Sequence, residues 1–76
     1  MPRYYFHILH DGRLIRDEEG IECPDINAMS REATQSARDL VAQRVQTKEL
    51  LDRDVVEVHD ERGQCVKRVK LSDMLH

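Results

Sequence analysis

The chain has 76 residues, which is the length of one small domain, and we treat residues 1–76 as a single unit. Hydrophobic residues make up 39% of the chain and charged residues 36%, so a thin core lies beneath a highly charged surface. The 12 Lys and Arg residues are outnumbered by 15 Asp and Glu residues, and the net charge of −3 argues against nucleic acid as a partner. No apolar run is long enough to span a membrane, so no membrane contact is expected.

The first residues, Met1 to Arg3, lead directly into a strand pattern and lack the charged and apolar regions of a signal peptide. We therefore expect a cytoplasmic protein. Cys23 and Cys65 are too few for a disulfide scaffold, and in the cytosol they should be thiols. Neither cysteine has a catalytic signature around it, so we expect neither an enzyme nor a cofactor.

Residues 3–16 alternate with a period of two, which predicts a strand, a turn and a return strand. One face of the first strand would carry Tyr4, Phe6 and Ile8, and the other Tyr5, His7 and Leu9. Apolar bulk on both faces indicates a central strand. Asp11-Gly12 predicts a two-residue hairpin turn, because both residues accept a positive φ. The acidic residues at 17–19 and Gly20 indicate a solvated turn that ends the return strand.

Helical spacing begins after Pro24. Asp25 is a good N-cap, because its carboxylate can accept from free backbone N–H groups at the start of a helix. The helix would end near Thr47. One apolar stripe runs along it, made of Ile26, Met29, Ala33, Ala37, Leu40, Val41 and Val45.

The last third of the chain predicts two more strands. In the connection at 48–54, Leu50 and Leu51 would lie under the core, and residues 55–58 would form the third strand. A turn ending at Gly63 leads to the fourth strand at 64–71, whose dense positive charge indicates a sheet edge. Cys65 would face the helix there, and Ser72 would cap a final turn.

These elements predict an α+β domain of ββαββ order, with one helix packed on a four-stranded antiparallel sheet in strand order 2-1-3-4. One helix can cover only one face of that sheet. The other face would be amphipathic, and we take it as the candidate interaction face. Its residues are Tyr5, His7, Leu9, Glu57 and His59.

The opening Pro-Arg-Tyr-Tyr-Phe-His at residues 2–7, the Asp-Gly at 11–12, the Asp-Glu-Glu-Gly at 17–20 and the Pro-Asp at 24–25 resemble a family of short, uncharacterised bacterial proteins. The resemblance covers nearly the whole chain and implies a domain of unknown function, with no catalytic residues to carry over. In layout alone, the chain is also similar to small antitoxin domains of the HicB type.

We therefore expect a small bacterial protein that acts as a non-enzymatic interaction module, as a homodimer or with another protein. One alternative is an antitoxin-like or regulatory protein that contacts a partner or nucleic acid. Another is a metal- or ligand-binding domain at His7 and His59, with Glu57 nearby. The usual close spacings of metal-binding His and Cys residues are missing from the sequence, so we assign no metal ligand from it.

Overall fold

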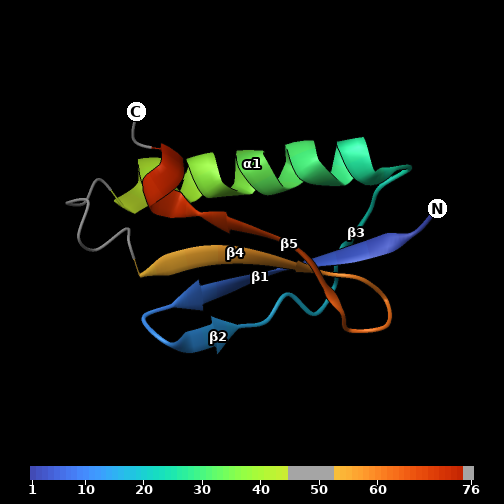
Figure 1. Ribbon diagram of the computed structural model, residues 1–76, viewed down its shortest axis with the longest axis horizontal. Coiled ribbons are helices and arrows are strands. Elements are labelled where there is room, and N and C mark those ends of the chain that lie inside the picture. The colour runs from blue at the N-terminus through green and yellow to red at the C-terminus, as the bar shows by residue number, and fades with distance from the viewer. Residues whose placement is uncertain (45–52, 75–76) are drawn as a thin grey trace.

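The structure is a computed structural model, and it describes residues 1–44 and 53–74. The protein is α+β, as predicted, with one helix lying on one face of an antiparallel sheet (Figure 1). The elements in chain order are β1 (Arg3–His10), β2 (Arg13–Ile15), β3 (Ile21–Glu22), α1 (Ile26–Arg44), β4 (Asp54–His59), β5 (Cys65–Lys70) and the short 3-10 helix η1 (Leu71–Met74).

The strand order is β2-β1-β4-β5, and β3 pairs with β1 as well. β1 is therefore central and β5 lies at an edge, as predicted. The predicted order 2-1-3-4 differs in detail, because the chain has an additional strand, β3, which pairs with Arg3 and Tyr4 of β1. β3 is only 2 residues long, too short to show a periodic pattern between Gly20 and Pro24.

The predicted turn between the first two strands is confirmed. Asp11 has a φ of 49° and Gly12 a φ of 82°, the left-handed pair that a tight hairpin requires. This turn sets the register in which Leu9 lies opposite Leu14 and His10 lies opposite Arg13. Because side chains alternate along a strand, that register places Leu14 on the same face of the sheet as Leu9.

The predicted N-cap of the helix is also confirmed. The Asp25 Oδ1 atom accepts the Ala28 N–H at 2.7 Å, and the Asp25 carbonyl accepts the Met29 N–H at 3.1 Å. The predicted helix end at Thr47 and the connection with Leu50 and Leu51 lie outside the described residues. Over residues 1–44 and 53–74, no helix is both long enough and apolar enough to cross a membrane.

The core lies between α1 and the sheet. The predicted strand residues Phe6, Val56 and Val58 are buried in it, and Tyr4, Leu40 and Val41 pack partly buried against it. Ile26 belongs to the predicted apolar stripe, but it is the first residue of α1 and remains 67% exposed. Cys23 fills the core at that end instead. The buried set is Phe6, Cys23, Met29, Ala33, Ala37, Val56, Val58 and Leu71.

We expect Phe6→Ala to lower the free energy of unfolding by about 3–5 kcal/mol, through lost burial and a residual cavity. The matched control is Ile26→Ala, which removes an exposed apolar side chain and should change stability by less than about 0.5 kcal/mol. Urea denaturation followed by circular dichroism measures both. A larger loss in the Ile26 variant than in the Phe6 variant would contradict this assignment of the core.

Candidate functional site

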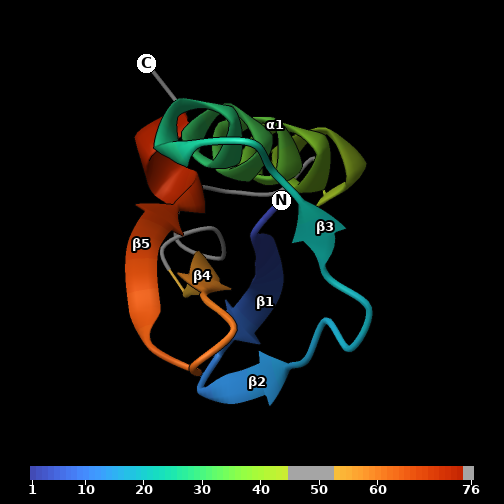
Figure 2. The same cartoon turned by 90° about the vertical axis from the view of Figure 1, so that its right-hand side faces the viewer.

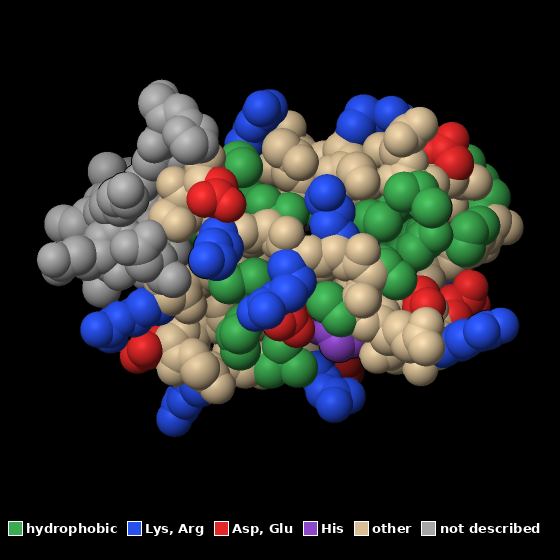
Figure 3. All heavy atoms as spheres, in the orientation of Figure 1, with side chains coloured by type: hydrophobic (Ala, Val, Ile, Leu, Met, Phe, Trp, Pro, Cys, Tyr) green, Lys and Arg blue, Asp and Glu red, His purple; other side chains and the backbone are tan. Residues whose placement is uncertain are grey.

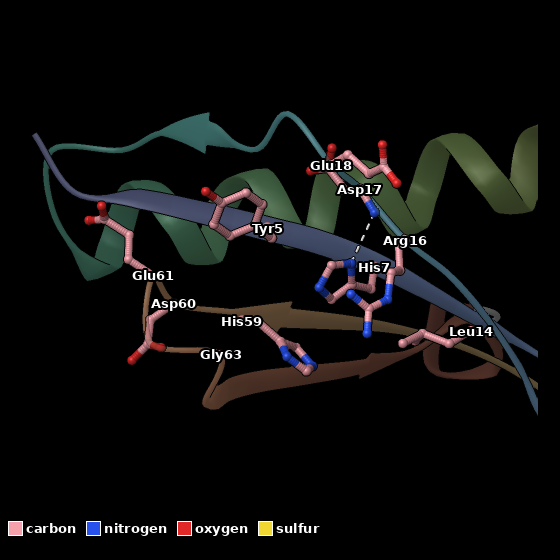
Figure 4. Close-up of a pocket in the computed structure, with 10 residues that line it drawn as sticks. All are labelled: Tyr5, His7, Leu14, Arg16, Asp17, Glu18, His59, Asp60, Glu61 and Gly63. Carbon is pink, nitrogen blue, oxygen red and sulfur yellow. Dashed lines mark hydrogen bonds between the residues drawn. The ribbon is translucent and has the colours of Figure 1, made fainter.

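The face of the sheet that points away from α1 is covered by no element in the described part of the chain. The sheet is curled, and β2 and β5 lie on either side of this face (Figure 2). We call it the open face. It holds a cavity of about 520 Å³ (Figure 4). The cavity is lined by Tyr5, His7, Leu14, Arg16, Asp17, Glu18, His59, Asp60, Glu61 and Gly63.

The pairing of β1 with β4 brings the predicted face residues together. Tyr5 lies opposite His59 and His7 lies opposite Glu57, whereas Leu9 lies one row further along, opposite Val55. The rings of His7 and His59 meet edge to face with their centroids 4.6 Å apart, and the Tyr5 ring stacks beside His7 at 6.4 Å. Tyr5, His7 and His59 line the cavity, whereas Leu9 and Glu57 lie outside its lining.

Asp17 ties the loop after β2 to the middle of β1. β2 pairs with β1 at residues 8–10 and β3 pairs with it at residues 3–4. Within residues 1–44 and 53–74, the edge of β1 between them has no strand partner. Asp17 Oδ2 accepts the Phe6 N–H in that gap at 3.1 Å, and Asp17 Oδ1 accepts the Gly20 N–H at 3.2 Å. The Asp17 N–H donates to His7 Nδ1 at 2.9 Å (Figure 4).

This role of Asp17 was missed by the sequence analysis, which treated residues 17–20 as a solvated acidic turn. The signal was present, because an Asp in a turn commonly accepts from the backbone two residues on, as Asp17 Oδ1 does from the Glu19 N–H at 3.3 Å. The consequence for the site is that His7 Nδ1 acts as an acceptor. The neutral ring of His7 therefore carries its proton on Nε2.

The surroundings of His7 keep it neutral. Partial burial lowers the pKa of His7 below its ordinary value of 6.5, and the neighbouring His59 lowers it further. The Asp17 and Glu57 carboxylates oppose this shift only in part, and Arg16 adds to it. A neutral His7 ring beside the Tyr5 ring makes this side of the cavity less polar than a charged His7 would.

Glu57 bridges two side chains of the open face. Its Oε1 atom lies 3.3 Å from His59 Nε2, and its Oε2 atom lies 3.2 Å from Arg68 Nε on β5. The side chain of Glu57 is 18% exposed and that of His59 is 20% exposed. The pair is therefore partly shielded from water, and its partners fix the orientation of the carboxylate.

Cys65 lies on the open face, which corrects the prediction that it faces the helix. The register of β4 with β5 shifts between Val58 and His59, so that Val58 lies opposite Lys67 and His59 lies opposite Cys65. Such a bulge turns the side chains beyond it to the other face. Cys65 is exposed, and its Sγ atom and the nearest ligand atoms of Glu57 and His59 all lie within 4.8 Å of one another.

The turn between His59 and Cys65 is held by Asp60. Its Oδ1 atom accepts the backbone N–H groups of Arg62 and Gln64, each at 2.9 Å. The Asp60 N–H donates to the Gln64 carbonyl at 2.9 Å. A turn closed by several hydrogen bonds limits how far the two residues at its base can separate.

The second cysteine is in a different environment. Cys23 is buried in the core, 3% exposed, on the helix side of the sheet. Burial raises the pKa of the Cys23 thiol, and the Glu32 and Asp25 carboxylates raise it further. Cys23 therefore stays an uncharged thiol and packs as a small hydrophobic side chain.

We expect stability to fall as the pH drops through 6.5, in part because His7 is held neutral in the fold. The unfolded chain takes up this proton at a higher pH than the folded chain, so the contribution of His7 is complete above pH 6.5 and is lost below it. Thermal melts from about pH 8 to about pH 5.5 measure this. The control, His7→Asn, keeps an acceptor near the Nδ1 position without a titrating ring, and its profile should be flatter. Parallel profiles of the two proteins would contradict the assignment.

We also expect Gly20→Ala to destabilise the fold more than Gly63→Ala. Gly20 has a φ of +70°, and a Cβ there would lie 2.9 Å from the Tyr4 carbonyl oxygen and from Tyr5 Cε2. Gly63 has a φ of +82° but nothing within 4 Å of the same position. The two variants share the cost of a left-handed residue, so overpacking should add about 1–3 kcal/mol to the first alone. Equal losses in urea denaturation would show that Tyr5 does not pack on Gly20.

Of three comparisons with known proteins, only the one with family models found a match. The comparison with curated proteins found no match, and neither did the comparison with solved structures. The likeness in layout to HicB-type antitoxin domains thus stays a prediction. The family model described as Domain of unknown function (DUF6894) matches residues 3–72, which include every strand and the helix. The chain therefore belongs to the DUF6894 family, a domain of unknown function.

Proposed function

We propose that this protein is a non-enzymatic interaction module that forms a homodimer through the open face. The observation that carries the proposal is the uncovered cavity in that face, whose lining includes Tyr5, His7 and Leu14. Leu14 is 42% exposed, and the lowered pKa of His7 keeps its ring uncharged at neutral pH. The rest of the lining is largely charged or polar, and exposed apolar side chains with a polar rim on a small domain are typical of a contact site.

The charges around the open face favour a second copy as the occupant. Asp60 and Glu61 lie at the end of the face next to His59. Arg68 and Lys70 lie on β5 toward its other end, opposite Glu57 and Val55. A two-fold axis through the face would set the acidic end of one copy against the basic end of the other. Such an interface is self-complementary, and this is the symmetry that dimers most often adopt.

The rest of the surface supports the same choice. Lys and Arg side chains are spread over the side of the molecule on which β5 lies, separated by apolar and acidic groups (Figure 3). Dispersed charge of one sign along an edge strand opposes pairing of that edge with another chain. Association through the open face is therefore favoured over continuation of the sheet through β5.

We place the dimer in the cytoplasm of a bacterium. Cys23 and Cys65 form no disulfide with each other, which fits a reducing compartment. The family membership supplies no reaction and no catalytic residue, and the proposed role is accordingly contact rather than catalysis.

We expect the parent protein to be a dimer in light scattering at micromolar concentration, and Tyr5→Ser with Leu9→Ser to shift it to the monomer. The two substitutions replace apolar contact area on the open face by hydroxyl groups that favour water. The matched control is Ile26→Ser, which changes an apolar side chain that is 67% exposed at the start of α1. This control should remain a dimer.

Two results would overturn the proposal. One is a parent protein that is monomeric at the same concentration, and the other is a double variant that remains a dimer while folded. Circular dichroism of each variant shows that it is folded before its mass is interpreted. The measurement is made in the presence of a metal chelator, so that it reports the contact between chains and no metal-dependent association.

A further inference from the structure

We propose that Glu57, His59 and Cys65 form a binding site for one Zn²⁺ ion at the base of the β4–β5 turn. Their ligand atoms, a carboxylate oxygen, an imidazole nitrogen and a thiol sulfur, all lie within 4.8 Å of one another. The site goes beyond the dimer contact, because all its ligands come from one chain. It also differs from the pair of His7 and His59 that the sequence suggested.

The donor set selects the class of metal. Thiolate and imidazole ligands favour Zn²⁺ and similar transition metals over Mg²⁺ and Ca²⁺, which take oxygen ligands. An ionised Glu57 and a thiolate at Cys65 together contribute two negative charges, which balance a divalent cation. Three protein ligands leave a fourth tetrahedral position for water or a further ligand.

The distances fit tetrahedral coordination with little rearrangement. His59 Nε2 and Glu57 Oε1 are 3.3 Å apart. Two ligands at about 2.0–2.1 Å from a zinc ion in tetrahedral geometry are themselves about 3.4 Å apart. The Cys65 Sγ atom lies within 4.8 Å of a ligand atom of each residue, and in a zinc complex it would lie about 3.6 Å from the imidazole nitrogen.

The backbone holds the ligands in place before any metal binds. His59 and Cys65 face each other at the base of one turn, and the register shift at Val58 and His59 is what brings Cys65 to this face. The two hydrogen bonds that Asp60 Oδ1 accepts close the turn between them. A preorganised set of ligands loses little conformational entropy when it binds.

Arg68 gives the carboxylate a second partner. Its Nε atom lies 3.2 Å from Glu57 Oε2, which leaves Oε1 directed toward His59. An ion pair of this kind orients a ligating carboxylate. His7 does not contribute Nδ1, because that atom already accepts the Asp17 N–H.

The test is titration of the metal-free full-length protein with Co²⁺, a spectroscopic substitute for Zn²⁺. We expect one Co²⁺ per chain and a thiolate-to-metal charge-transfer band in the near ultraviolet. The band should disappear in Cys65→Ser and weaken in His59→Gln. It should persist in the matched control Cys23→Ala, which removes the other thiol. Zn²⁺ should displace the Co²⁺ and abolish the band.

A second measurement uses only the parent protein, and so does not depend on whether the core variant Cys23→Ala folds. In the parent protein, iodoacetamide should modify Cys65, and Zn²⁺ at about ten times its Kd should slow this reaction roughly tenfold while the Cys23 rate stays unchanged. Mass spectrometry of the peptides separates the two sites. The proposal fails if the parent protein shows no cobalt–thiolate band, if the band survives in Cys65→Ser, or if Zn²⁺ leaves the alkylation of Cys65 unchanged. The cobalt band reports on ligands that belong to one chain. The alkylation rates with and without Zn²⁺ are compared at one protein concentration, at which light scattering shows the same state of association.

Discussion

The open face depends on the bonds that Asp17 makes across the unpaired edge of β1. Between β3 and β2, no strand in the described part of the chain pairs with the central strand on that side, and a backbone N–H left without an acceptor there would be costly. The Asp17 carboxylate accepts the Phe6 N–H and closes its own turn at Gly20. The Asp17 side chain thereby completes the sheet edge and holds one wall of the cavity, and the Asp17 backbone N–H fixes the tautomer of His7.

Acidic side chains also hold the opposite wall of the cavity, by accepting backbone N–H groups. The Asp60 carboxylate closes the β4–β5 turn, and Glu61 Oε1 accepts the Arg3 N–H at 3.2 Å, so the turn is also linked to the start of β1. The two loops that border the cavity are therefore anchored by acidic side chains. Acidic residues outnumber basic ones in this chain, and those in these turns act as acceptors for backbone groups.

The sequence predicted the parts of the fold that periodicity and local chemistry determine. The alternation in β1, the Asp11-Gly12 turn and the Asp25 cap each have a local cause, and each was found. β3 was missed because two residues carry no period. Cys65 was placed on the wrong face because strand alternation assumes an unbroken register, whereas the register shifts between Val58 and His59.

The candidate face could be predicted as far as strand alternation determines it, and no further. Tyr5, His7 and His59 were grouped from alternation and strand order, and the structure brings them together around one cavity. Arg68 and Cys65 beside Glu57 could not be grouped with them from the sequence, because their positions depend on the pairing register of β5. Contacts between distant strands depend on register, and the register here follows from a bulge that leaves no signature in composition.

The two cysteines differ in a way that has a practical consequence. Cys23 is enclosed by the core on the helix side of the sheet, while Cys65 is exposed on the opposite face beside His59. A thiol-reactive dye or spin label added to the folded native chain meets a single accessible sulfur. The unmodified protein thus carries its own attachment point for a reporter, and that point lies directly on the surface through which we propose that the chain makes its contacts.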